Sequence, residues 1–218
     1  MDLDFSIIQR NAPLFLEGFM VTIELSLLAI VFSLLWGLPV VVARLSPVAP
    51  LCILARSYLE AVRNTPVLVQ MYFIYFGSGI AGYPISGYFA GLLALTLQNG
   101  GYISEIYRAG IQSIDRGQRE GGAALGMLPF QIFRIVVFPQ AIRRVIPPIS
   151  NQGVIIIKDT SLVSALSVAE LTYQSKILAD RTAATYEIFI TLAIFYIVIT
   201  TFYSGALRLI EGRFRVLQ

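Results

Sequence analysis

Long apolar runs alternate with short charged stretches along this chain. The first run extends from Val21 to Ala43 with Glu24 as its only charge, which is long enough to cross ~30 Å of hydrocarbon as a helix. Four further runs follow, and together they predict an all-α, polytopic membrane protein with five transmembrane helices in one domain, 1–218. The predicted spans are approximately 19–43, 57–80, 85–108, 145–169 and 187–209.

The second predicted span carries charge in its first part, and the fourth carries charge at its middle. Arg63 and Glu60 interrupt the second, and Lys158 and Asp159 lie in the fourth. A charge at the centre of a bilayer is costly, by ~3 to ~15 kcal/mol depending on how it is measured. These residues are therefore expected either to act in function or to form structural ion pairs, such as Asp159 with Arg63 or Lys158 with Glu60.

Composition narrows the possible functions. Hydrophobic residues make up 56% of the chain and charged residues 13%, too little polar surface for a soluble domain. The chain has no histidine, which excludes histidine-based zinc sites and Ser/His/Asp catalysis within it. It has no GxxxxGK(S/T) sequence for ATP, and its single cysteine cannot form an intrachain disulfide. We expect a protein that is not an enzyme and holds no cofactor or metal of its own.

Basic residues are unevenly distributed between the two sides that five spans would define. Most lie after the first span, in and around the loop 112–139, and after the last span, whereas the other side has only Arg10, Lys176 and Arg181. Because cytoplasmic loops carry excess Lys and Arg, we predict a bacterial cytoplasmic (inner) membrane protein with its N-terminus outside and its C-terminus inside. The acidic N-terminal residues argue against a cleaved signal peptide. The net charge of +3 reflects this asymmetry and not nucleic-acid binding.

The loop 112–139 contains a short amphipathic stretch, Asp115 to Pro129, with glycines at four positions. Each glycine lowers helix stability by up to about 1 kcal/mol relative to alanine, which suggests close approach of another protein. The alternative is a helix lying among lipid headgroups, whose buried face usually carries larger apolar residues. The residues alone favour neither.

The spacing within this loop resembles the EAA loop of ABC importer permeases, whose pattern is EAA, three residues, G, nine residues, I-x-LP. The matching residues are Glu120-Gly121-Gly122, Gly126, Val136, Phe138 and Pro139. In that family the loop forms a coupling helix that docks into a cleft of the ATPase subunit. The resemblance implies that the ATPase is contacted through Arg119, Glu120, Gly121, Gly122, Ala123, Gly126 and Met127. Glycines replace both alanines of the family pattern, so the docking point stays small while the helix is expected to be softer.

Three further segments are similar to the polar amino acid branch of these permeases. They are Arg63-Asn64-Thr65-Pro66 with Val67 to Gln70, Ser104 to Ile111, and Lys158-Asp159-Thr160-Ser161-Leu162-Val163. The similarity implies a fold like that of type I ABC importer permeases. It also implies a set of partners: a cytoplasmic ABC ATPase dimer that binds ATP and Mg²⁺, a second permease subunit (identical or different), an extracytoplasmic amino acid binding protein, membrane lipid and a polar amino acid substrate.

The same residues indicate where a substrate would bind. Pro66 removes the hydrogen bond to the carbonyl of Val62, so a break or kink is predicted around Asn64 and Thr65. Backbone N–H groups and the Thr65 hydroxyl at a break could hold a carboxylate, and a plain proline kink is the alternative. Asp159 would accept hydrogen bonds from the substrate's ammonium group, as the resemblance also implies.

Gln152 lies seven residues before Asp159, near the same helix face. It is neutral and Gly153 leaves space beside it, which favours glutamine, glutamate or aspartate over a cationic substrate. An interhelical hydrogen bond is the alternative role for Gln152. The candidate substrate-binding residues are Asp159, Thr65, Asn64, Pro66, Gln152 and Lys158.

These features predict the transmembrane permease subunit of an ATP-driven, binding-protein-dependent importer of polar amino acids. Access to a site near Asp159 and the Thr65–Pro66 break would alternate as the ATPase moves the helix that carries Glu120. Two other classes stay open. An ion-coupled secondary amino acid transporter would use Lys158 and Asp159 and would predict inverted repeats, which the hydropathy pattern does not show. A non-transport membrane scaffold would use the loop 112–139 as a general docking segment.

Overall fold

The computed structural model describes residues 4–214, with side chains described up to Leu209, and all the regular secondary structure in this part is helical. The prediction of an all-α protein is therefore confirmed. The helices are α1 (Ser6–Arg10), α2 (Ala12–Leu45), α3 (Ala49–Asn64), α4 (Val67–Ile80), α5 (Gly87–Gln112), α6 (Arg116–Ala124), α7 (Pro129–Gln131), the π-helical segment η1 (Ile132–Val137), α8 (Phe138–Asp159), the 3-10 segment η2 (Thr160–Leu166), α9 (Leu171–Thr182) and α10 (Thr185–Phe214).

The predicted spans map onto these helices with two interruptions. Among the described residues, α2 and the part of α10 up to Leu209 are long and apolar enough to cross a membrane by length and hydropathy alone. The second predicted span is divided between α3 and α4. The fourth changes from α-helix to 3-10 helix after Asp159. Polar sequence thus coincides with irregular backbone, as expected where a membrane helix lines a cavity or a protein contact.

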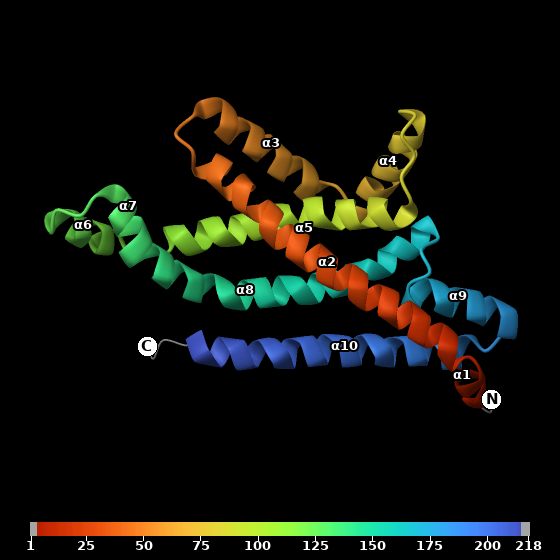
Figure 1. Ribbon diagram of the computed structural model, residues 1–218. Helices are drawn as coiled ribbons and strands as arrows, with labels where there is room; N and C mark the ends of the chain where they lie inside the picture. The colour runs from red at the N-terminus through yellow and green to blue at the C-terminus, as the bar shows by residue number, and fades with distance from the viewer. Residues whose placement is uncertain (1–3, 215–218) are drawn as a thin grey trace.

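The long helices run between two ends of the bundle (Figure 1). The short helices α1 and α9 lie at one end, and α6 and α7 lie at the other. Helix α5 is central and packs against α2, α3, α4 and α8. The largest core cluster joins α2, α4, α5, α8 and η2 through buried residues that include Leu25, Met71, Leu95, Ile156 and Val163.

Small residues allow α2 and α5 to approach closely. A Cβ added at Gly100 would lie 2.6 Å from Cδ1 of Trp36, and one added at Gly37 would lie 2.9 Å from Cγ2 of Ile103. Lipid is as apolar as a leucine side chain, so membrane helices associate through close packing and interhelical hydrogen bonds and not through the hydrophobic effect. The glycines at this crossing are therefore packing positions.

A buried carboxylate joins three helices at the end of the bundle where α1 and α9 lie. Glu170 is fully buried, and its side chain caps α9 by accepting hydrogen bonds from the N–H groups of Thr172 (2.9 Å) and Tyr173 (2.7 Å). The Tyr196 hydroxyl of α10 donates to the same carboxylate at 3.2 Å, and Thr22 of α2 lies 3.5 Å away. Glu170 thus links α9 to α10 and α2.

Replacing Glu170 by alanine should destabilise this end of the bundle. Glu170→Ala would leave buried donors unpaired, and we expect a loss of roughly 3 kcal/mol, measured as a lower thermal unfolding midpoint of the protein purified in detergent. Glu17→Ala is the matched control, because Glu17 is an exposed residue of α2. Equal midpoints for the two variants would contradict a structural role for Glu170.

Candidate substrate site and coupling surface

The helix interruption predicted at Pro66 is a full break. Helix α3 ends at Asn64, Thr65 and Pro66 have extended backbone conformations, and α4 begins at Val67. Figure 1 shows α3 and α4 meeting at an angle. The side chains of Asn64 and Thr65 are exposed. The plain proline kink is thereby replaced by two separate helices.

Gln70 occupies the centre of this break. Its Nε2 lies 3.0 Å from the Val62 carbonyl oxygen, the acceptor that Pro66 leaves without its helical partner. The same nitrogen lies 3.2 Å from the carbonyl oxygen and 3.0 Å from the hydroxyl of Thr65, and 3.1 Å from Oε1 of Gln98 on α5. The sequence signal was a polar side chain one turn after the proline, but its partners could not be read from it.

The amides at the start of α4 are the donors that this break offers. The Thr65 hydroxyl donates to the Ala61 carbonyl at 2.7 Å and lies near Gln70, so in this conformation its proton is already used. The first-turn N–H groups of Val67 and Leu68 have no intrahelical acceptor. A carboxylate at the break would therefore be held by backbone amides.

Lys158 and Asp159 lie at the C-terminal end of α8, where the 3-10 segment begins. Lys158 is exposed and Asp159 is half-buried. Neither makes the structural ion pair considered from the sequence: among the described side chains, the ion pairs are those of Glu105 with Arg44 and Arg108.

The break and the end of α8 adjoin a common core. Val67, directly after the break, and Ile156, one turn before Asp159, belong to the same buried cluster. Helix α4 also packs against η2. The backbone amides at the break and the carboxylate of Asp159 thus lie next to one shared packed core.

Gln152 is buried and lies between α8 and α5. Its Nε2 donates to Oδ1 of the buried Asn99 at 2.8 Å, so the interhelical hydrogen bond considered as its alternative role is formed here. The expectation of free space at Gly153 is wrong, because a Cβ added there would collide with the Tyr203 hydroxyl of α10. A helix–helix contact fills this space, which a sequence pattern within α8 could not indicate.

Helix α6 has one face on its own chain and one face open. Arg119 donates to the Ile111 carbonyl at 2.8 Å, and a Cβ at Gly122 would lie 3.0 Å from Ile132. By contrast, a Cβ at Gly121 would meet no atom within 4 Å, and Glu120 is exposed. The two glycines of the predicted docking point therefore have different surroundings.

The ends of α6 are set by its sequence. The Asp115 carboxylate accepts a hydrogen bond from the Gly117 N–H at 2.7 Å, which caps the first turn. Gly126 has φ +78°, a conformation that glycine adopts easily and that stops the helix. Ala123 is exposed and Met127 is half-buried beyond that stop.

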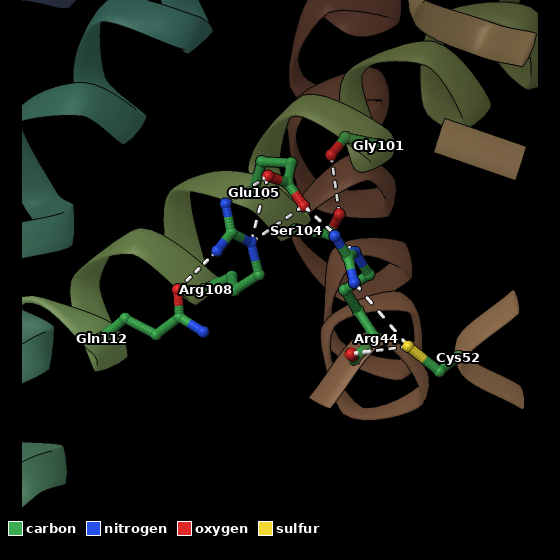
Figure 2. Close-up of polar contacts among 7 residues, drawn as sticks. All are labelled: Arg44, Cys52, Gly101, Ser104, Glu105, Arg108 and Gln112. Carbon is green, nitrogen blue, oxygen red and sulfur yellow. Dashed lines mark hydrogen bonds and ion pairs between the residues drawn. The ribbon is translucent and has the colours of Figure 1, made fainter. Parts of the chain in front are cut away.

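A charged cluster lies where α2 and α5 approach the same end of the bundle as α6 (Figure 2). Arg108 Nη2 donates to Glu105 at 2.7 Å, and Arg44 Nε lies 3.8 Å from the same carboxylate. Arg108 also contacts Gln112, and Arg44 contacts Cys52. Sequence reasoning did not assign this cluster, because Glu105 and Arg108 lie together on α5 whereas Arg44 comes from α2, about 60 residues earlier in the chain.

Comparisons with known proteins agree with this architecture. Residues 27–216 match the family model described as binding-protein-dependent transport system inner membrane component. The chain is 37% identical to the glutamine transport system permease protein GlnP of Escherichia coli K12, over 100% of both chains. It is 34% identical to the probable glutamine ABC transporter permease protein GlnM of Bacillus subtilis 168, over 97% of this chain and 98% of the relative.

A solved structure shares the fold. A chain in the crystal structure of an amino acid ABC transporter with histidines superposes with a TM-score of 0.93 and 37% identity, covering 98% of this chain and 100% of that chain. The fold is thus that of an ABC importer permease. This chain belongs to the family of inner membrane components of binding-protein-dependent transport systems. It is a transport subunit and not an enzyme.

The geometry at the break predicts that Gln70 stabilises it. Gln70→Leu keeps the size of the side chain but leaves the Val62 carbonyl and Thr65 without their donor. We expect a loss of about 2 kcal/mol, measured as a lower thermal unfolding midpoint of the purified complex.

Gln9→Leu serves as the control, because Gln9 is exposed on α1 and makes no side-chain hydrogen bond within the described chain. If Gln70→Leu unfolds at the wild-type temperature, the break does not depend on this amide.

Proposed function

We propose that this chain is the transmembrane permease subunit of an ATP-driven, binding-protein-dependent importer of polar amino acids, with glutamine or glutamate and aspartate as substrates. The observation that carries the proposal is the half-buried carboxylate of Asp159, which has no cationic partner in the described chain. Asp159 is the last residue of α8, and this end of α8 packs on the same core as the start of α4. An intramembrane carboxylate without a partner favours a polar, cationic ligand group. The full-length similarity to permeases named for glutamine supports this substrate class.

The two ends of an amino acid would meet opposite chemistry. Its ammonium group would donate to Asp159, and its carboxylate would accept from the amides of Val67 and Leu68, where the α4 dipole also favours an anion. Gln152 keeps this region uncharged while it bonds to Asn99. Gln152 is an amide and offers no carboxylate to a guanidinium side chain, which favours glutamine, glutamate or aspartate.

Movement of α6 would couple this site to ATP hydrolysis in a separate cytoplasmic ATPase dimer that binds ATP and Mg²⁺. Glu120, Gly121 and Ala123 form the exposed face for docking, and Arg119 and Gly122 attach the helix to the rest of the chain. The end of the bundle that carries α6 is cytoplasmic in this proposal, and the end that carries α1 and α9 faces the amino acid binding protein. A second permease subunit, identical or related, would complete the pathway.

The two other classes considered from the sequence are less well supported. The family match concerns binding-protein-dependent systems, whereas an ion-coupled secondary transporter would need neither a binding protein nor a docking helix. A scaffold would not require an unpartnered carboxylate within the bundle. Import by the purified chain without any ATPase would overturn the proposed function.

Glu120→Lys should uncouple transport from ATP hydrolysis. A reversed charge on the exposed face of α6 would disturb docking, and we expect import into proteoliposomes to fall about tenfold or more. The measurement is uptake of labelled amino acid by the reconstituted permease, ATPase and binding protein. Glu17→Lys is the control, because it makes the same change on α2, away from α6. Wild-type import by Glu120→Lys would remove α6 from the coupling surface.

Asp159→Asn should abolish import without affecting assembly. The amide has nearly the same shape but lacks the charge that holds an ammonium group, so we expect import to fall by at least about tenfold. Copurification of the ATPase should be unchanged. Normal import by Asp159→Asn would make this carboxylate a structural residue.

The same vesicles identify the substrate. Unlabelled glutamine, glutamate, arginine and histidine compete with labelled glutamine or glutamate for uptake. Competition by glutamine or glutamate supports the proposed class, whereas competition by arginine or histidine alone would overturn it.

A further inference from the structure

A polar cavity lies apart from Asp159, between α2, α3 and α5. Its volume is about 550 Å³, and its charged lining residues are Arg44, Arg56, Glu60, Arg63 and Glu105. Three arginines thus face two glutamates. Leu59 is the only aliphatic residue in its wall.

Only some of these charged side chains form ion pairs within the described chain. Glu105 is engaged by Arg44 and Arg108 (Figure 2). Arg56, Glu60 and Arg63 make no ion pair or side-chain hydrogen bond with any described residue. Each is exposed within the chain.

The three unused charges lie in a row on one face of α3. They are spaced by four and three residues, close enough to pair with one another on a helix, yet they do not. Arg63 instead lies over the ring of Tyr102, with its Cζ 5.7 Å from the ring centroid, which holds the guanidinium at the cavity wall. The row presents a cation, an anion and a cation to the cavity.

The cavity connects two functional regions. Asn64, in its wall, is the last residue of α3 before the break. Arg44, at its other side, lies in the last turn of α2, at the end of the bundle where α6 lies. A molecule leaving the break toward that end would pass the charged row.

We propose that this cavity is a second binding site for the zwitterionic head group of an amino acid, on the cytoplasmic side of the Asp159 site. The carboxylate is held by Arg56 and Arg63, and the ammonium group is held by Glu60. This inference rests on the proposed function for the substrate class and for the direction of passage. The site receives the amino acid after it leaves Asp159 and before it enters the cytoplasm.

The cavity wall favours this ligand over a phospholipid. A phospholipid headgroup also combines an anion with an ammonium group, but its acyl chains need an apolar groove. With Leu59 as the only aliphatic residue, the wall offers no such groove. The Glu60 carboxylate, which has no ion-pair partner among the described residues, also disfavours a purely anionic ligand.

The test measures binding of ¹⁴C-glutamine and ¹⁴C-glutamate, each separately, to the nucleotide-free complex of permease and ATPase by equilibrium dialysis. The Asp159→Asn background removes the first site, so the binding that remains reports the cavity. Adding Arg56→Gln should weaken this remaining binding about tenfold, because one charge-assisted contact is lost. Arg143→Gln, an exposed arginine of α8 that does not line the cavity, should leave it unchanged.

Glu60→Gln provides an independent variant if the Arg56→Gln complex does not assemble, and it should weaken binding similarly. The absence of any binding in the Asp159→Asn background, or equal binding with and without Arg56→Gln, would overturn the proposal. Loss of copurified phospholipid in Arg56→Gln, with amino acid binding unchanged, would also overturn it and assign the cavity to lipid.

Failure of this inference is distinguishable from failure of the proposed function. If wild-type complexes import amino acid and Asp159→Asn blocks import, the proposed function holds whatever Arg56→Gln does. If wild-type complexes import no amino acid, the proposed function itself is wrong, whatever the binding measurements on the cavity show.

Discussion

Unpaired backbone groups are intolerable in hydrocarbon, and the break at Thr65–Pro66 creates such groups within a predicted membrane span. Each unsatisfied group there costs several kcal/mol. The Gln70 amide meets this requirement by binding the freed Val62 carbonyl and Thr65. Its contact with Gln98 also attaches the break to the central helix α5. One side chain thus binds the freed acceptors of the break and fixes the break to its neighbour in the bundle.

Polar contacts and close packing also hold the other helices of the bundle together. Apolar burial gives little preference for one helix contact over another when lipid surrounds the protein. The specific contacts are therefore polar or very close: Gln152 with Asn99 between α8 and α5, Glu170 with Tyr196 between α9 and α10, and Gly100 against Trp36 between α5 and α2. These contacts form a rigid frame around the less regular segments that carry the candidate site.

Features that depend on local sequence could be predicted, and features that depend on helix rotation could not. Apolar runs, the proline and the glycine-rich loop indicate the helical fold, the break and α6, because each acts on its own segment. The partner of Gln152 is 53 residues away, and Gly153 packs against Tyr203 on another helix. Neither contact has a signature within α8. The end of α8 at Asp159 likewise depends on packing of η2 against α4 and α5.

The polar face of this chain constrains how it can sit in a membrane. Glu60 and Arg63 on α3 and Lys158 on α8 lie in predicted spans and are exposed within the single chain. Charged side chains at membrane depth do not face acyl chains without a large penalty. Water or another protein must therefore cover them. In a single chain surrounded by lipid, this polar face would be in contact with acyl chains and would be covered by neither water nor protein. The proposed second permease subunit, placed against this face, would enclose it as an aqueous pathway. The charges that make the single chain unsuited to lipid are therefore the physical argument for the proposed pairing of two subunits.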